Sequence, residues 1–171
     1  MDFTTLTDAQ LDDMRCTPKT ISNPGARWVT KGSHREKNYH LVATRNPEEK
    51  YRVFVRVSEH NESVFSAGII RVFGPDEALV LARYNGGYHP HRNVLEKTKV
   101  PAVCHRHIAT ERYIKAGHDP DGFAEPINDY NTVEGAVATL CQHCCIGTED
   151  SVPDVVPQQA ETPSKQATFD F

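Results

Sequence analysis

The chain has 171 residues, of which 38% are hydrophobic and 25% are charged, and its formal net charge is −4. This composition is typical of a water-soluble globular protein, and no stretch approaches the roughly 18 apolar residues that a membrane-spanning helix needs. The N-terminus, Met1-Asp2-Phe3-Thr4, is acidic and polar and does not have the pattern of a signal or transit peptide, so we expect a cytoplasmic protein with no membrane partner. The five cysteines are then expected to be thiols or metal ligands rather than a disulfide framework.

Sequence signals indicate a short N-terminal helix followed by strands. Thr7-Asp8-Ala9-Gln10 has the form of a capping box, which predicts a helix that ends at Thr17-Pro18. Further along the chain, hydrophobic and polar residues alternate with the period of two that is typical of strands. Four strands with short turns are predicted, over residues 39–44, 51–58, 65–73 and 78–85. Sequential strands joined by short turns form an antiparallel meander.

Two further helices are predicted in the C-terminal half of the chain. The first covers about residues 107–116 and ends at Gly117. The second follows a cap signature at Asn131-Thr132 and carries an apolar stripe to about residue 146. We therefore predict an α+β fold with a short N-terminal helix, a four- to five-stranded antiparallel meander and two C-terminal helices packed on one face.

Charge is distributed unevenly along the chain. Residues 27–115 carry 16 Lys and Arg residues and nine Asp and Glu residues, a net charge of +7, whereas residues 148–171 carry −4. The basic segment suits a phosphate backbone, although composition alone favours a set of solvated strand faces. Because residues 148–171 are rich in Pro, Gln, Ser and acidic residues, we predict one folded domain over 1–147 and a disordered acidic tail over 148–171.

Four of the nine histidines fall between residues 89 and 107 as two closely spaced pairs. Imidazole titrates near neutral pH, so one can act as base and another as acid in cleaving a phosphodiester bond, while an arginine neutralises the phosphate. The alternative is a set of polar loop and helix-cap histidines. The predicted catalytic histidines and phosphate-binding arginines are His89, His91, His105 and His107, and Arg83, Arg106 and Arg112.

Glu111 completes this hypothesis. It lies four residues after His107, so on a helix the two side chains would share a face, and the carboxylate would orient the imidazole. A surface ion pair between Glu111 and Lys115 is the alternative at the same spacing.

A cysteine cluster raises the alternative of a zinc site. Cys141 and Cys144 have the C-x-x-C spacing of half a zinc site, but no second C-x-x-C follows. Cys104 and His143 are the residues that would complete it. Cysteines in the apolar stripe of a helix are more often small core residues, so no cofactor is favoured and zinc remains the alternative.

Two features suggest macromolecular partners. Arg52, Phe54 and Arg56 alternate along one strand, so they would lie on one face, which resembles a nucleic-acid platform but also an ordinary exposed strand. In the tail, Gln166, Phe169 and Phe171 resemble the short peptides that dock into DNA sliding clamps.

Several blocks between about residues 20 and 147 resemble a family of small prokaryotic proteins of unknown function. These blocks are Asn23–Trp28, Gly32–Arg35, Arg83–His89, Cys104–Tyr113, Ala124–Pro126 and Asp129-Tyr130. The order of a strand ending in Arg-Tyr-Asn, two histidine pairs and a Val-Glu-rich helix is also similar to the TumE-type toxins of toxin–antitoxin systems. This resemblance implies a toxin that acts on RNA and is neutralised by a cognate antitoxin.

The sequence therefore supports two functions of different classes. The first is a cytoplasmic, toxin-like, metal-independent ribonuclease or RNA-binding protein that uses the histidine cluster. The second is a non-enzymatic interaction module with a structural His/Cys cluster, with or without zinc, whose tail binds a sliding clamp. Convergence of the histidine pairs in an open basic cleft favours the first, and clustering of the cysteines with a histidine favours the second.

Overall fold

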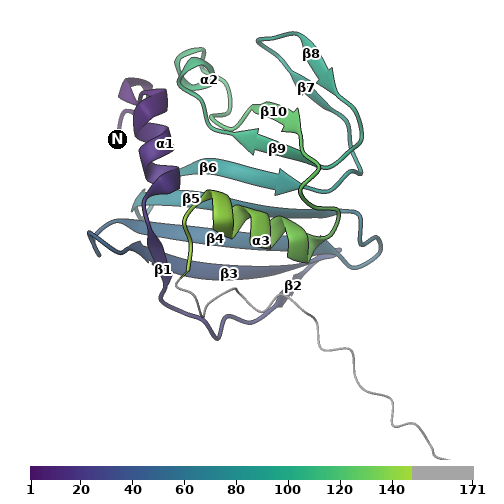
Figure 1. The fold of residues 1–171 in the computed structure, drawn as a ribbon, viewed down its shortest axis with the longest axis horizontal. Coiled ribbons are helices and arrows are strands. Elements are labelled where there is room, and N and C mark those ends of the chain that lie inside the picture. Colours follow the sequence, from purple (N-terminus) through teal and green to yellow (C-terminus); the bar gives the residue numbers. More distant parts are fainter. Residues whose placement is uncertain (148–171) are drawn as a thin grey trace, which may run out of the picture.

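The computed structural model describes residues 1–147, which form an α+β fold around an antiparallel sheet (Figure 1). The main sheet of these residues has eight strands in the order β1-β3-β4-β5-β6-β9-β10, and β2 also pairs with β3. A separate hairpin consists of β7 (His91–Asn93) and β8 (Thr98–Val100). The strands of the main sheet are β1 (Lys19–Ile21), β2 (Val29–Lys31), β3 (His34–Ala43), β4 (Lys50–Ser58), β5 (Phe65–Gly74), β6 (Glu77–Asn85), β9 (His105–Ile108) and β10 (Phe123–Pro126).

The long strands β3 to β6 occupy the positions predicted from the alternating pattern. In β4, Tyr51, Val53 and Val55 are buried, whereas Arg52 and Arg56 are exposed. Successive side chains point to opposite faces, so this alternation gives the sheet one apolar and one polar face. The sheet exceeds the predicted four to five strands because β1, β2, β9 and β10, of three or four residues each, extend it.

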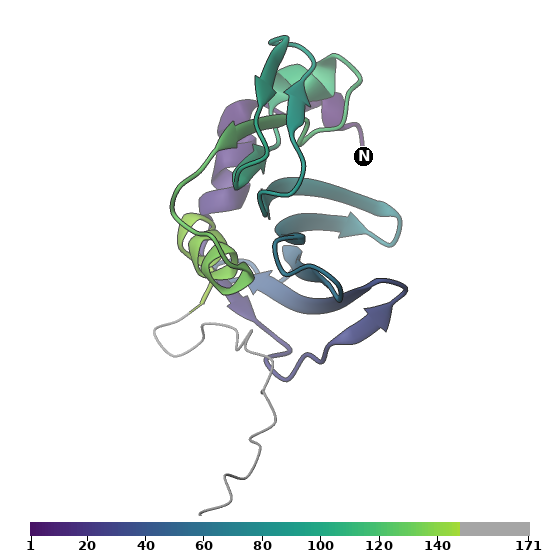
Figure 2. The same cartoon turned by 90° about the vertical axis from the view of Figure 1, so that its right-hand side faces the viewer.

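Helices cover the apolar face of the sheet. α1 (Asp8–Cys16) begins at the predicted capping box of Thr7 and Gln10 and contacts β6, while α3 (Val133–His143) lies across β4, β5 and β6 (Figure 1). Figure 2 shows both helices on the same side of the sheet. α3 contributes the fully buried Val137 and Leu140 to the core, as its apolar stripe predicts. No helix in the described part of the chain is long and apolar enough to cross a membrane.

The prediction of a helix over residues 107–116 is only partly right. α2 covers Glu111–Lys115, whereas His105–Ile108 forms β9, which pairs with β6 on one side and β10 on the other. These backbone hydrogen bonds come from distant parts of the chain and override the local helix signal. α2 contacts the 3-10 turn η1 (Phe3–Thr5).

The predicted tail over residues 148–171, with the motif of Gln166, Phe169 and Phe171, lies outside the described residues.

Candidate functional site

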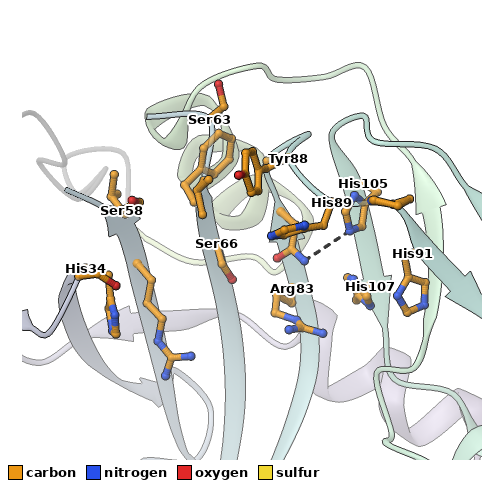
Figure 3. A pocket seen from close by; sticks show the side chains of 18 residues that line it. His34, Ser58, Ser63, Ser66, Arg83, Tyr88, His89, His91, His105 and His107 are labelled. Atoms are coloured by element: carbon orange, nitrogen blue, oxygen red, sulfur yellow. Dashed lines mark hydrogen bonds between the residues drawn. The ribbon is translucent and has the colours of Figure 1, made fainter. Parts of the chain in front are cut away.

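A pocket of about 500 Å³ opens on the face of the sheet that α1 and α3 leave uncovered (Figure 3). Five of the nine histidines line it. His34 and Ser58 lie at one end, and His91, His105 and His107 lie at the other, with Ser66 and Arg83 between them (Figure 3). A pocket of this size accommodates a small organic ligand or a short segment of a polymer.

Cross-strand register arranges the pocket side chains in two rows. From β4 to β9, the first row contains Arg56, Ser66, Asn85 and His105. Two residues away on each strand, the second row contains Arg83 and His107, which line the pocket, and Phe54 and Gly68, which do not. Residues two apart on a strand share a face, so both rows lie on the open face of the sheet. Four segments distant in sequence thus bring basic and polar groups together.

His105 and His107 are buried, and hydrogen bonds define which ring nitrogen carries the proton. Nδ1 of His107 lies 2.9 Å from the carbonyl oxygen of Asp121, and Nδ1 of His105 lies 2.8 Å from that of Val103. A carbonyl oxygen only accepts, so each Nδ1 donates its proton, and each Nε2 is left with a lone pair when the ring is neutral. Asn85 donates to Nε2 of His105 over 3.4 Å.

The surroundings keep both imidazoles neutral. Burial, together with the charge of Arg83, lowers the pKa of His107 to about 3. Burial also lowers the pKa of His105. At neutral pH, Nε2 of His107 is therefore an unprotonated nitrogen beside a cationic guanidinium.

The hairpin β7–β8 brings a third imidazole to the pair. The ring centroid of His91 lies 4.5 Å from that of His107, and the centroids of His105 and His107 are 5.1 Å apart. Nε2 of His91 donates to the carbonyl oxygen of Gly122 over 2.9 Å, which leaves Nδ1 for other contacts. The two predicted histidine pairs therefore converge. His89 lies at the exposed rim, edge-on to the ring of Tyr88.

Arg83 is the cation closest to this cluster in the sheet, since it pairs directly with His107 across β6 and β9. Its Nε lies 3.1 Å from Oδ2 of Asp121, whose side chain is only 11% exposed. Burial raises the pKa of Asp121, and the charge of Arg83 opposes this shift. Asp121 therefore orients Arg83 through its carboxylate and His107 through its main-chain carbonyl.

The structure does not bring Glu111 to the histidines. His107 lies on β9 rather than on the helix, so the predicted shared helix face of His107 and Glu111 is wrong. Glu111 instead forms an ion pair with Lys115 and accepts the main-chain N–H of Asp8 over 3.2 Å. Its role is to join α2 to the start of α1.

Only one of the three predicted phosphate ligands reaches the pocket. Arg112 forms an ion pair with Glu96 at 2.7 Å, so its charge is already matched elsewhere. Arg106 points to the opposite face from His105 and His107, where it pairs with Glu125. Of the three predicted arginines, Arg83 is therefore the one that lines the pocket.

The predicted nucleic-acid face divides into different environments. Phe54 is 5% exposed because its ring covers Gly68, so it offers no free surface for base stacking. Arg56 lines the pocket and lies over the Phe54 ring, with its guanidinium carbon 4.7 Å from the ring centroid. Arg52 is exposed and does not line the pocket.

The predicted zinc ligands have other surroundings. Cys141 and Cys144 are buried in the core, and burial raises their pKa values to about 12 and about 11. Nδ1 of His143 lies 3.0 Å from the hydroxyl of Tyr84. Burial also raises the pKa of Cys104. Within residues 1–147, no group of three or more His, Cys, Asp or Glu side chains is arranged to hold a metal ion.

Comparison with protein families, with curated proteins and with solved structures finds no match. The function is therefore inferred from the chemistry of the pocket.

Several residues of the site were missed from the sequence, among them the pocket residues His34, Ser66 and Asn85, and Asp121 beside the pocket. Asp121 and Asn85 carry no local signal, because an acid in a Gly- and Pro-containing loop and an amide before Gly86 are both typical of turns. Ser66 begins an unremarkable apolar strand. Strand pairing places Asn85 and Ser66 in the site, and the loop before β10 places Asp121 there. Neither can be predicted from the hydrophobic periodicity of the sequence.

Proposed function

We propose that this protein is a metal-independent ribonuclease whose active site is the pocket around His107. The observation that carries the proposal is the direct cross-strand pairing of His107 with Arg83, since it places an unprotonated imidazole nitrogen beside a phosphate-binding cation. The pocket supplies further polar groups through His91, His105 and Asn85. The resemblance of the sequence to TumE-type toxins, which implies RNA as the substrate, supports the same choice.

In the proposed reaction, Nε2 of His107 accepts the proton of a ribose 2′-hydroxyl, and the freed oxygen attacks the adjacent phosphorus. The bond from phosphorus to the 5′ oxygen breaks, and His91, protonated on both ring nitrogens, donates its Nδ1 proton to that oxygen while its Nε2 keeps the hydrogen bond to the carbonyl oxygen of Gly122. The products are a 2′,3′-cyclic phosphate and a 5′-hydroxyl, so the step consumes no co-reactant. Arg83 offsets the negative charge that develops on the phosphate oxygens.

Substrate binding also improves the base. Burial and the positive charge of Arg83 both lower the pKa of His107 in the free protein. A bound phosphate offsets that positive charge, so the pKa of His107 rises toward the range where a base is effective. His107 is therefore a weak base in the free protein and a stronger base when a phosphate is bound beside Arg83.

The test is cleavage of a short single-stranded RNA by the purified protein at neutral pH in EDTA. We expect fragments ending in a 2′,3′-cyclic phosphate, and we expect His107→Gln to lower the rate by about a hundredfold or more, the usual worth of a general base. His40→Gln is the matched control, because His40 is exposed on β3 and lies outside the pocket. A 2′-deoxy substitution at the cleaved nucleotide should block the reaction.

Two results would overturn the proposal. One is intact RNA after prolonged incubation at high protein concentration. The other is equal cleavage by the wild type and His107→Gln, because a contaminating nuclease or a different site would then be responsible.

A further inference from the structure

Arg56 is held in place at the far end of the pocket from the histidine cluster. Its Nε donates to Oε2 of Glu36 over 2.6 Å, and its guanidinium lies over the ring of Phe54. Glu36 and Phe54 are 6% and 5% exposed, so the two groups that fix the arginine are themselves fixed by burial. Among residues 1–147, the hydrogen bond and ion pair found for the Arg56 guanidinium both run through Nε, and none is found for its Nη atoms. A guanidinium held through Nε, with its remaining donors open, is suited to an anion.

The charges around Arg56 do not cancel. Glu36 accepts from both Arg56 and Lys31, and these hydrogen bonds, with the charge of Arg56, lower its pKa to about 2 although burial opposes them. One carboxylate is therefore shared between two cations, so Glu36 does not fully neutralise Arg56. His34 and Ser58 lie beside it and offer further polar groups (Figure 3).

Arg56 and the proposed catalytic residues are separated by a distance that a nucleic-acid strand can bridge. Arg56 is in the first row with Asn85, two strands away, which corresponds to about 10 Å between their backbones. The long side chains of Arg56 and Arg83 narrow this gap, and Ser66 and Gly68 between them add little bulk. One continuous groove therefore connects two cationic positions.

We infer that Arg56 forms a second phosphate subsite, which binds the phosphate next to the one that is cleaved. The inference rests on the proposed ribonuclease function and names its substrate class: a single strand with at least two consecutive phosphates, not a mononucleotide or an isolated phosphodiester. Glu36 is a positioning residue, because it acts through Arg56.

The experiment measures binding, so that it does not depend on cleavage. The ligands are deoxydinucleotides, which are not cleaved because they lack the 2′-hydroxyl nucleophile. Their affinities are measured by calorimetry at low salt. Each dinucleotide is compared with the same dinucleotide carrying an additional phosphate at its 5′ or its 3′ end. We expect one terminal phosphate to increase the affinity of the wild type by roughly tenfold to a hundredfold, as hydrogen bonds to a charged group do. Arg56→Gln should reduce this gain to less than about twofold.

Lys31→Gln is the matched control. Lys31 and Arg56 carry the same charge, pair with the same carboxylate and are similarly exposed, at 53% and 51%, but only Arg56 lines the pocket. The control should keep most of the gain from the terminal phosphate. An equal loss in both variants would show a general charge effect and overturn the subsite.

The two proposals fail separately. If neither terminal phosphate strengthens binding to the wild type, or if Arg56→Gln keeps the full gain, the second subsite is wrong while RNA cleavage by His107 can still stand. If RNA is not cleaved but the gain and its loss in Arg56→Gln are observed, the reaction is wrong and the subsite stands.

Discussion

Acidification should destabilise this protein through His107, and the size of the effect follows from its burial. The imidazole is 3% exposed, and its pKa falls from 6.5 to about 3 in the folded state. Between these two values the unfolded chain binds a proton that the folded chain does not. The free energy of unfolding therefore falls as the pH drops below 6.5, and the loss is complete only near pH 3.

A pH of 5 lies about 1.5 units below the pKa of His107 in the unfolded chain, and each unit corresponds to about 1.4 kcal/mol. His107 alone therefore lowers the free energy of unfolding at pH 5 by about 2 kcal/mol. The loss is large compared with the total stability of a typical domain, which is about 5–15 kcal/mol. Burial lowers the pKa of His105 as well, which acts in the same direction.

The assay is urea denaturation followed by far-ultraviolet circular dichroism at pH 7 and pH 5, for the wild type and His107→Gln. Carboxylates titrate in both proteins, so the informative quantity is the difference between their pH-dependent losses of stability. We expect the variant to lose about 2 kcal/mol less than the wild type between the two pH values. His40→Gln is the control substitution at an exposed position, and it should follow the wild type. If His107→Gln and the wild type lose the same stability, the imidazole is not buried in neutral form, and its proposed role as an unprotonated base is refuted.

Three further substitutions test the packing and the site. Lys19→Met should lower the free energy of unfolding by about 3 kcal/mol in urea titrations, because the buried ammonium donates to three carbonyl groups at the ends of α1 and α3 that would lose their partner. Gly68→Ala should cost about 1–3 kcal/mol in the same assay, since the added methyl group would overlap the ring of Phe54, and an unchanged midpoint would show that the ring moves freely. Asp121→Asn should lower kcat/KM for RNA by about tenfold, because Arg83 loses the ion pair that holds it in position and a small misplacement of a positioning group can cost up to about a hundredfold. Unchanged kinetics would remove Asp121 from the site.

The fold could be predicted wherever its signal is local. The capping box at Thr7 starts α1, and period-two alternation marks the four long strands. The strands of three or four residues contain too few alternations to distinguish them from loops. β9 exists because β6 and β10 pair with it from both sides, and both partners are distant in sequence.

Only one end of the candidate site could be predicted from the sequence. The density of histidines singled out the window that forms one end of the pocket. The sequence could not reveal that Arg56 of β4 belongs to the same groove, because this depends on the register of three successive strand pairs. A shift of one residue in any of these pairs would turn the partner side chain to the other face.

The error over Arg106 shows how one wrong element propagates into a wrong site. His105 and His107 share the pocket face because β9 is a strand, and the same alternation must turn Arg106 to the opposite face, toward Glu125. The alternation of a strand does not apply to the predicted helix, so nothing in the sequence placed Arg106 on the opposite face from the histidines. The paired histidines and the intervening arginine therefore cannot all belong to one site. A cation that shares the pocket face with these histidines must come from another strand, and cross-strand pairing places Arg83 of β6 there.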